Sequence, residues 1–130
     1  MSPDFKYLIC TALLTAALWI PYVISQVITN GLLTPQNYRD PTPRTVPLWG
    51  LRAHRAYLNS VEVFAPFATL VILAALTGKA NSVTALCAAG FFWLRLTHAI
   101  VYLVGLAYIR TIVFTLAFFA LCGIAWQLLC

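Results

Sequence analysis

Polar residues of the types that bind anions recur at helical spacing in the middle of the chain. Arg52, Arg55, Asn59 and Glu62 are separated by three, four and three positions, and Pro66 continues the series. This spacing places the side chains along one stripe of a helix. Because arginine binds carboxylates with two parallel hydrogen bonds, the stripe predicts a site for an anionic ligand.

A second polar stripe follows in the next segment, where Arg95, His98 and Tyr102 are separated by three and four positions. Glu62 has Arg55 or Arg95 as its natural partner, and such an ion pair would lock two helices together. Four arginines accompany this one glutamate: Arg52, Arg55, Arg95 and Arg110. Their surplus of positive charge favours an anionic ligand over a purely structural ion pair.

The sequence does not indicate a metal site. His98 is interpreted as a packed or hydrogen-bonding residue, because no Cys, Asp or second His stands at the spacing of a ligand set. His54 is expected on the exposed head of its helix. The cysteines lie in or beside apolar runs and are interpreted as small membrane-buried residues: Cys10, Cys87, Cys122 and Cys130.

The composition decides which solvent surrounds these stripes. The 130 residues are 62% hydrophobic and 8% charged, whereas an ordinary soluble domain carries about 25% charged residues. A soluble fold could not hide this much apolar surface, so we expect a membrane protein in contact with lipid. The basic residues are scattered rather than clustered, and we therefore expect no nucleic-acid partner.

Four apolar segments are long enough to cross a bilayer, which takes about 20 residues. We expect a single domain over residues 1–130, with helices at about 5–28, 46–76, 83–104 and 110–129 and a loop over 30–45. Pro21 is expected to kink the first helix, and the prolines of the loop exclude a regular helix there. The expected fold class is an all-α membrane protein, a four-transmembrane-helix bundle.

Basic residues near the helix ends predict the orientation of the bundle. The first and third loops are flanked by Arg39, Arg44, Arg52 and Arg110, and the opposite ends by Lys6 and Lys79. By the positive-inside bias, loops one and three face the cytoplasm. We expect a multi-pass protein of a bacterial inner membrane, because the chain is compact and has no evident retention tail.

Both polar stripes resemble motifs of the MAPEG family, the membrane-associated proteins of eicosanoid and glutathione metabolism. The run RAYLNSVE at 55–62 is similar to the family's R-x-x-x-N-x-x-E signature. The run RLTHAIVYL at 95–103, followed by Arg110 and Thr111, resembles a stretch of prostaglandin E synthases and bacterial members. The chain thus resembles a bacterial-type member related to these synthases and to microsomal glutathione transferases.

The resemblance implies a homotrimer that binds glutathione between protomers near the cytoplasmic side, while an apolar small-molecule electrophile enters from the lipid. We expect glutathione to be bound by Arg52, Arg55, Asn59, Glu62, Arg95 and His98, and the catalytic residues to be Tyr102, Arg110 and Thr111. Glutathione carries two carboxylates for the arginines and one ammonium for the glutamate. An arginine at the start of a helix also favours the thiolate form of its cysteine.

The predicted function is a glutathione-dependent transferase or peroxidase in which Arg110 stabilises the thiolate. The alternative is a non-catalytic lipid-binding or scaffold protein of the same fold. A small drug/proton exporter would also have four helices, but it would carry its essential glutamate in the first helix. No charge lies in this chain between Lys6 and the end of the first segment.

Overall fold

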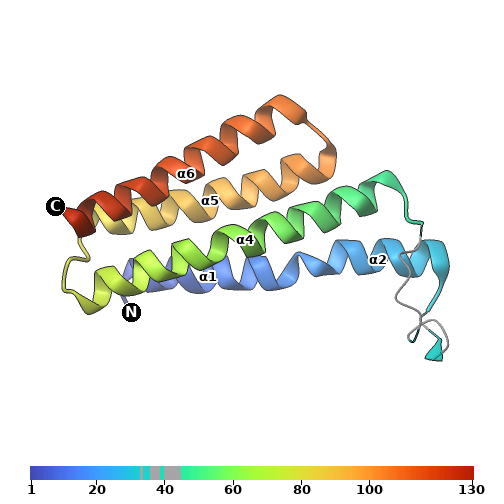
Figure 1. Ribbon diagram of the computed structural model, residues 1–130, viewed down its shortest axis with the longest axis horizontal. Coiled ribbons are helices and arrows are strands. Elements are labelled where there is room, and N and C mark those ends of the chain that lie inside the picture. Colours follow the sequence, from blue (N-terminus) through green and yellow to red (C-terminus); the bar gives the residue numbers. More distant parts are fainter. Residues whose placement is uncertain (33, 36–38, 40–44) are drawn as a thin grey trace.

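The computed structural model describes residues 1–32, 34, 35, 39 and 45–130. The chain forms long helices and, within the described residues, no strand (Figure 1). The helices are α1 (Pro3–Ala17), α2 (Trp19–Asn30), α4 (Leu48–Leu76), α5 (Ser82–Val104) and α6 (Ala107–Leu129). The expected loop over 30–45 falls largely outside the described residues, Arg44 included.

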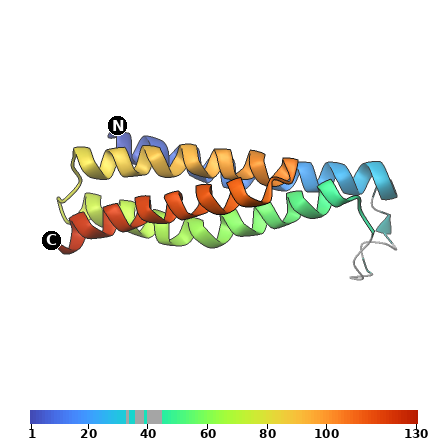
Figure 2. The ribbon, with the colours of Figure 1, turned by 90° about the horizontal axis from the view of Figure 1, so that it is seen from above.

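The first predicted helix is interrupted, as its proline suggested. The α-helix breaks at Leu18, whose backbone N–H donates to both Leu14 (3.1 Å) and Thr15 (3.4 Å). Pro21 lies three residues later and cannot donate to the carbonyl of Ala17, so the regular ladder is lost one turn before the proline. The two halves nevertheless run end to end along one side of the molecule (Figures 1 and 2).

The connections between the other helices follow from local sequence signals. Asn81 caps α5 by accepting from the N–H groups of Val83 (2.8 Å) and Thr84 (3.0 Å), and Thr84 completes the capping box. Gly105 ends α5 at a φ of 93°, which glycine adopts without strain. The predicted short turns at both places are confirmed.

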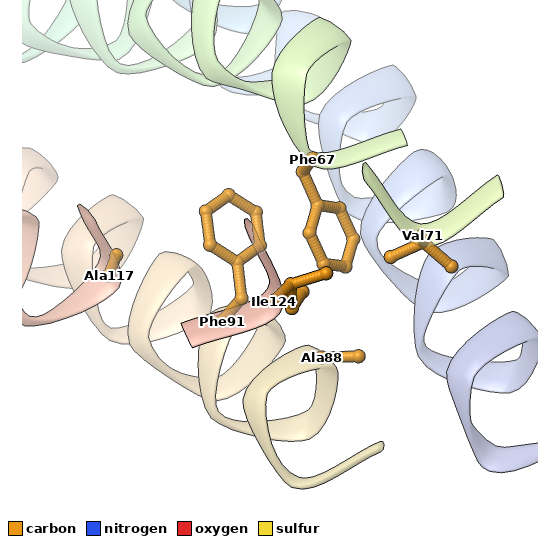
Figure 3. Close-up of a cluster of buried hydrophobic side chains, with 6 residues drawn as sticks. All are labelled: Phe67, Val71, Ala88, Phe91, Ala117 and Ile124. Carbon is orange, nitrogen blue, oxygen red and sulfur yellow. The ribbon is translucent and has the colours of Figure 1, made fainter. Parts of the chain in front are cut away.

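Helices α4, α5 and α6 enclose the apolar core. Figure 3 shows its members, Phe67, Val71, Ala88, Phe91, Ala117 and Ile124, converging from these three helices. The rings of Phe67 and Phe91 stack with centroids 4.2 Å apart. Helix α1 covers both α4 and α5, whereas α2 packs mainly on α4, near its start. Pro66 stands inside α4 without ending it.

The bundle has the dimensions and surface of a membrane protein. Four stretches are long and apolar enough to cross a bilayer: Pro3–Asn30, Leu48–Leu76, Ser82–Val104 and Ala107–Leu129. The 29 residues of α4 span about 43 Å at 1.5 Å per residue, more than a hydrocarbon core of about 30 Å. The predicted all-α, four-span fold class is confirmed.

Both ends of the chain lie at one end of the bundle, together with the turn at 77–81 (Figure 1). The opposite end holds the start of α4, the end of α5 and the start of α6. The two predicted stripes lie on α4 and α5, and α6 adds Arg110 and Thr111. The fold therefore places the candidate chemistry toward one membrane boundary.

Candidate functional site

A cavity of about 380 Å³ opens where α4 begins, α5 ends and α6 begins. Its lining residues come from these three helices and the turn between the last two: Leu48, Leu51, Arg52, His54, Arg55, Tyr102, Gly105, Leu106, Ala107 and Arg110. Three of these side chains are cationic and none is acidic. The cavity is therefore a positively charged chamber with apolar walls, which suits an anionic ligand.

A second cavity of about 250 Å³ shares Tyr102 and Arg110 with the first. It is further lined by Asn59, His98, Thr111 and Phe114. The guanidinium carbon of Arg110 lies 4.6 Å from the centroid of the Tyr102 ring, a cation–π contact. Arg110 and Tyr102 thus form the wall where the two cavities meet.

Arg52 is held in the larger cavity by the end of α5. Its Nε donates to the carbonyl of Leu103 at 3.1 Å, one of the last carbonyls of that helix. A side chain at Gly105 would stand 3.5 Å from the same guanidinium. A cation at a helix C-terminus is favoured by the macrodipole, so this contact fixes Arg52 before any ligand arrives.

Arg95 points into the bundle and not into these two cavities. It is 2% exposed, and its Nη2 donates to Asn59 Oδ1 at 2.6 Å and to Ser60 Oγ at 3.2 Å. Its Nε and Nη1 are buried without a hydrogen-bond partner. In the single chain, Arg95 therefore contacts the ligand site only indirectly, through Asn59.

The expected ion pair between Glu62 and Arg55 or Arg95 is absent from the described part of the chain, so this prediction is wrong for a single protomer. Glu62 and Arg55 are both exposed, and Arg95 donates a hydrogen bond to Asn59 instead. Three further residues turn a helix by about 300°, which leaves Glu62 about 60° away from Asn59. Asn59 is half-buried at the edge of the packed side of α4, so this further turn is enough to leave Glu62 on the exposed side.

His98 lies between the cavity and the core. It is 2% exposed, and its ring meets that of Tyr102 edge-on at 5.6 Å and that of Phe114 at 6.0 Å. The interpretation of His98 as a packed residue agrees with this position, although its edge also lines the second cavity. Within the described residues, no group of three or more His, Cys, Asp or Glu could hold a metal ion.

Helix α6 begins at Ala107, three residues earlier than predicted, and no side chain caps its first N–H groups. Arg110 therefore stands in the first turn, beside uncapped backbone donors at the edge of the cavity. Thr111 follows it, is exposed and donates its hydroxyl to the carbonyl of Ala107 at 3.4 Å. Both the arginine and the helix terminus favour negative charge at this place.

Sequence reasoning misplaced His54. The residue is half-buried, and its ring packs on Tyr22 of α2 with centroids 4.4 Å apart, so its predicted place on an exposed head is wrong. Helix α2 carries Tyr22, Gln26 and Asn30 at intervals of four within a mostly apolar segment. This polar series was the signal that could have indicated a fourth helix beside the site.

Comparison with known proteins agrees with the motifs. The model of the MAPEG family matches residues 7–130, nearly the whole chain. No curated protein matches the chain. The family match, the four membrane-spanning segments and the cavity that Arg52, Arg55, Tyr102 and Arg110 share lead to one conclusion: the chain is a member of the MAPEG family.

Proposed function

We propose that the protein is a glutathione-dependent transferase or peroxidase that acts on an apolar electrophile. The observation that carries the proposal is the joint wall of the two cavities, where Arg110 lies over Tyr102 at the uncapped start of α6. Family membership supports the proposal, since the MAPEG family includes glutathione transferases and peroxidases as well as non-catalytic members.

The charges around the larger cavity match those of glutathione. Arg52, Arg55 and Arg110 line it without an acidic neighbour in the lining, and glutathione brings two carboxylates. The volumes of about 380 and 250 Å³ fall near the lower end of ordinary small-molecule sites. We assign carboxylate binding to Arg52 and Arg55, with Asn59 as a neutral partner in the second cavity.

Arg110 is the residue to which we assign the activation of sulfur. A thiolate is the nucleophile in such reactions, and both a guanidinium and a helix N-terminus stabilise it relative to the thiol. In transfer, the thiol proton leaves to solvent, the sulfur forms a bond to the electrophilic carbon, and the leaving group departs with its electron pair. Tyr102 orients Arg110 through its ring. The bond from the Thr111 hydroxyl to Ala107 is long, at 3.4 Å, so this hydroxyl can turn and donate to the thiolate instead.

The proposed assembly is a homotrimer with the ligand between protomers. Glu62 and Arg55 lie exposed on the bundle surface, and charge facing lipid would cost about 2.5–3.5 kcal/mol per residue. A neighbouring protomer would cover these residues and bring Glu62 near a partner. We place loops one and three in the cytoplasm of a bacterial cell, with the bundle in its inner membrane.

Turnover of a chromogenic electrophile by detergent-purified protein tests the proposed function. We expect glutathione-dependent activity that Arg110→Ala reduces by at least tenfold, because each 1.4 kcal/mol of lost transition-state stabilisation is a factor of ten. Lys6→Ala, which removes an exposed cation at the opposite end, is the matched control and should retain full activity. Glutathione binding without turnover would instead favour the non-catalytic lipid-binding or scaffold protein.

A further inference from the structure

Helix α2 carries a chain of hydrogen bonds that leads toward the larger cavity. Asn30 donates from Nδ2 to the carbonyl of Thr45 (3.0 Å) and to Gln26 Oε1 (3.2 Å). Gln26 in turn donates from Nε2 to the hydroxyl of Tyr22 at 2.7 Å. Two polar residues of a membrane-spanning helix, Gln26 and Asn30, thus hold the Tyr22 ring in one position.

Close packing fixes this helix against the start of α4. Ser25 is fully buried and donates to the carbonyl of Tyr22 at 2.6 Å. A Cβ atom at Gly50 would overlap the side chain of Ser25, with its Cβ only 2.7 Å away, so only glycine fits at that position of α4. The two helices therefore cannot shift relative to each other without losing this contact.

The Tyr22 ring supports His54 at the wall of the cavity. The two ring centroids are 4.4 Å apart with an angle of 37° between the planes. His54 lines the same cavity as Arg52 and Arg55, and Nδ1 is its buried nitrogen, without a hydrogen-bond partner. Nε2 remains the accessible nitrogen, and we assign the proton to it because a buried N–H without an acceptor is rarer than an unfilled lone pair.

We propose that His54, held in place by Tyr22, is a further ligand-binding residue that donates from Nε2 to a carboxylate of glutathione. The inference rests on the proposed function and adds a neutral donor to the arginines that attract the same group. Because His54 is already fixed by α2, ordering it on binding costs little. Tyr22 and Gln26 are positioning residues, which act through the orientation of the imidazole.

Two substitutions of His54 separate its donor from its packing. His54→Phe keeps an aromatic ring against Tyr22 but removes Nε2, whereas His54→Gln loses the ring and keeps an amide donor. Hydrogen bonds to a charged group contribute enough that we expect roughly tenfold weaker glutathione binding for His54→Phe. We expect His54→Gln to recover part of this loss, and thermal unfolding in detergent should show both variants folded.

Carboxyl-modified ligands identify the group that His54 contacts. Two analogues of glutathione, each with one carboxylate converted to an ester, are titrated calorimetrically against wild type and His54→Phe. Esterification and His54→Phe should each weaken binding. For one of the two analogues these losses should not add, because the ester has already removed the carboxylate that His54 contacts. Losses that add for both analogues would overturn the inference. Tyr22→Leu should weaken binding in wild type and have no further effect in His54→Phe.

The outcomes distinguish this inference from the function on which it rests. Wild type that binds glutathione while His54→Phe binds equally well overturns the role of His54 alone. Wild type that does not bind glutathione at all overturns both. A Tyr22→Leu loss that adds fully to that of His54→Phe would show that Tyr22 acts through general packing, and it would overturn the positioning role.

Discussion

Arg95 is the largest fully buried side chain in the described part of the bundle. Its charge is met by one short bond, from Nη2 to Asn59 Oδ1 (2.6 Å), and one longer bond, to Ser60 Oγ (3.2 Å). A buried cation is costly unless its hydrogen bonds are made. Asn59 therefore has two roles. Its hydrogen bond offsets part of the free energy that burial of the Arg95 cation costs, and its side chain also lines the second cavity.

Asn59→Ala should lower the free energy of unfolding by about 1.5–3 kcal/mol, because a hydrogen bond to a charged group is lost in a buried place. Ser60→Ala should cost less, since its bond is longer and Asn59 remains. Thermal unfolding in detergent without glutathione measures both and keeps ligand binding out of the comparison. Equal melting temperatures for wild type and Asn59→Ala would contradict this account of Arg95.

Residue types and spacing predicted which side chains carry the chemistry but not all of their directions. Arg52, Arg55, Tyr102 and Arg110 do line one cavity. Spacing fixes a stripe on one helix, however, and it does not say which edge of the stripe the neighbouring helix covers. Glu62 could for this reason be placed on the polar stripe of α4 but not on its outward edge.

At the scale of the elements, the turn between α5 and α6 sets where Arg110 stands. Gly105 closes α5 with a φ of 93°, and Arg52 binds the carbonyl of Leu103 beside it. The turn thus connects three parts of the site: the last carbonyls of α5, a cation from α4 and the first turn of α6. A change in the turn should therefore reach the cavity directly.

Gly105→Ala should destabilise the protein by about 1–2 kcal/mol, because an L-residue is strained in the left-handed region. Gly90→Ala is the matched control, since Gly90 lies inside α5 with nothing within 4 Å of an added Cβ. There the same change should be neutral or stabilise by up to about 1 kcal/mol. If the melting temperature in detergent falls equally for both variants, the turn does not specifically require glycine at position 105.

Helix ends were predictable where the sequence carries a capping residue. Asn81 indicates the start of α5 because its side chain can cap the first N–H groups. Gly105 indicates the end because its backbone can adopt a positive φ. The start of α6 was placed three residues late, because Leu106 precedes it without a capping side chain and the charge of Arg110 stood out instead. Pro21 predicted roughly where the first helix breaks but not the exact residue. The carbonyl that loses its hydrogen bond lies one turn before the proline.

At the scale of the whole molecule, the surface of the single chain carries charged groups at the level of the membrane-spanning segments. Glu62 and Arg55 are exposed on α4, and Arg95 keeps two buried N–H groups without partners. Charged groups in these positions are expensive in a membrane. Association of protomers along this face would offset that cost. The resemblance to the MAPEG family leads us to expect three protomers.

Native mass spectrometry in detergent should show a homotrimer. Glu62→Gln should shift the distribution toward monomers on dilution while leaving the secondary structure of the monomer unchanged, because Glu62 has no ion pair within its own chain. Lys6→Gln, which removes a single charge of the opposite sign at the other end of the bundle, should keep the trimer. A wild type that is monomeric at every concentration would contradict the proposal that Glu62 lies at an interface between protomers.

The thiolate absorbance of bound glutathione tests the central claim most directly. It is titrated against pH at saturating glutathione, in wild type, Arg110→Ala and Arg55→Ala. The account predicts a thiol pKa in the wild-type complex below that of free glutathione. Arg110→Ala should raise this pKa toward the free value, while Arg55→Ala should weaken binding and leave the pKa of the bound thiol largely unchanged. Wild type that binds glutathione and shows no thiolate below pH 8, a threshold just under the value of about 8.5 for a free cysteine, would contradict the assignment of Arg110.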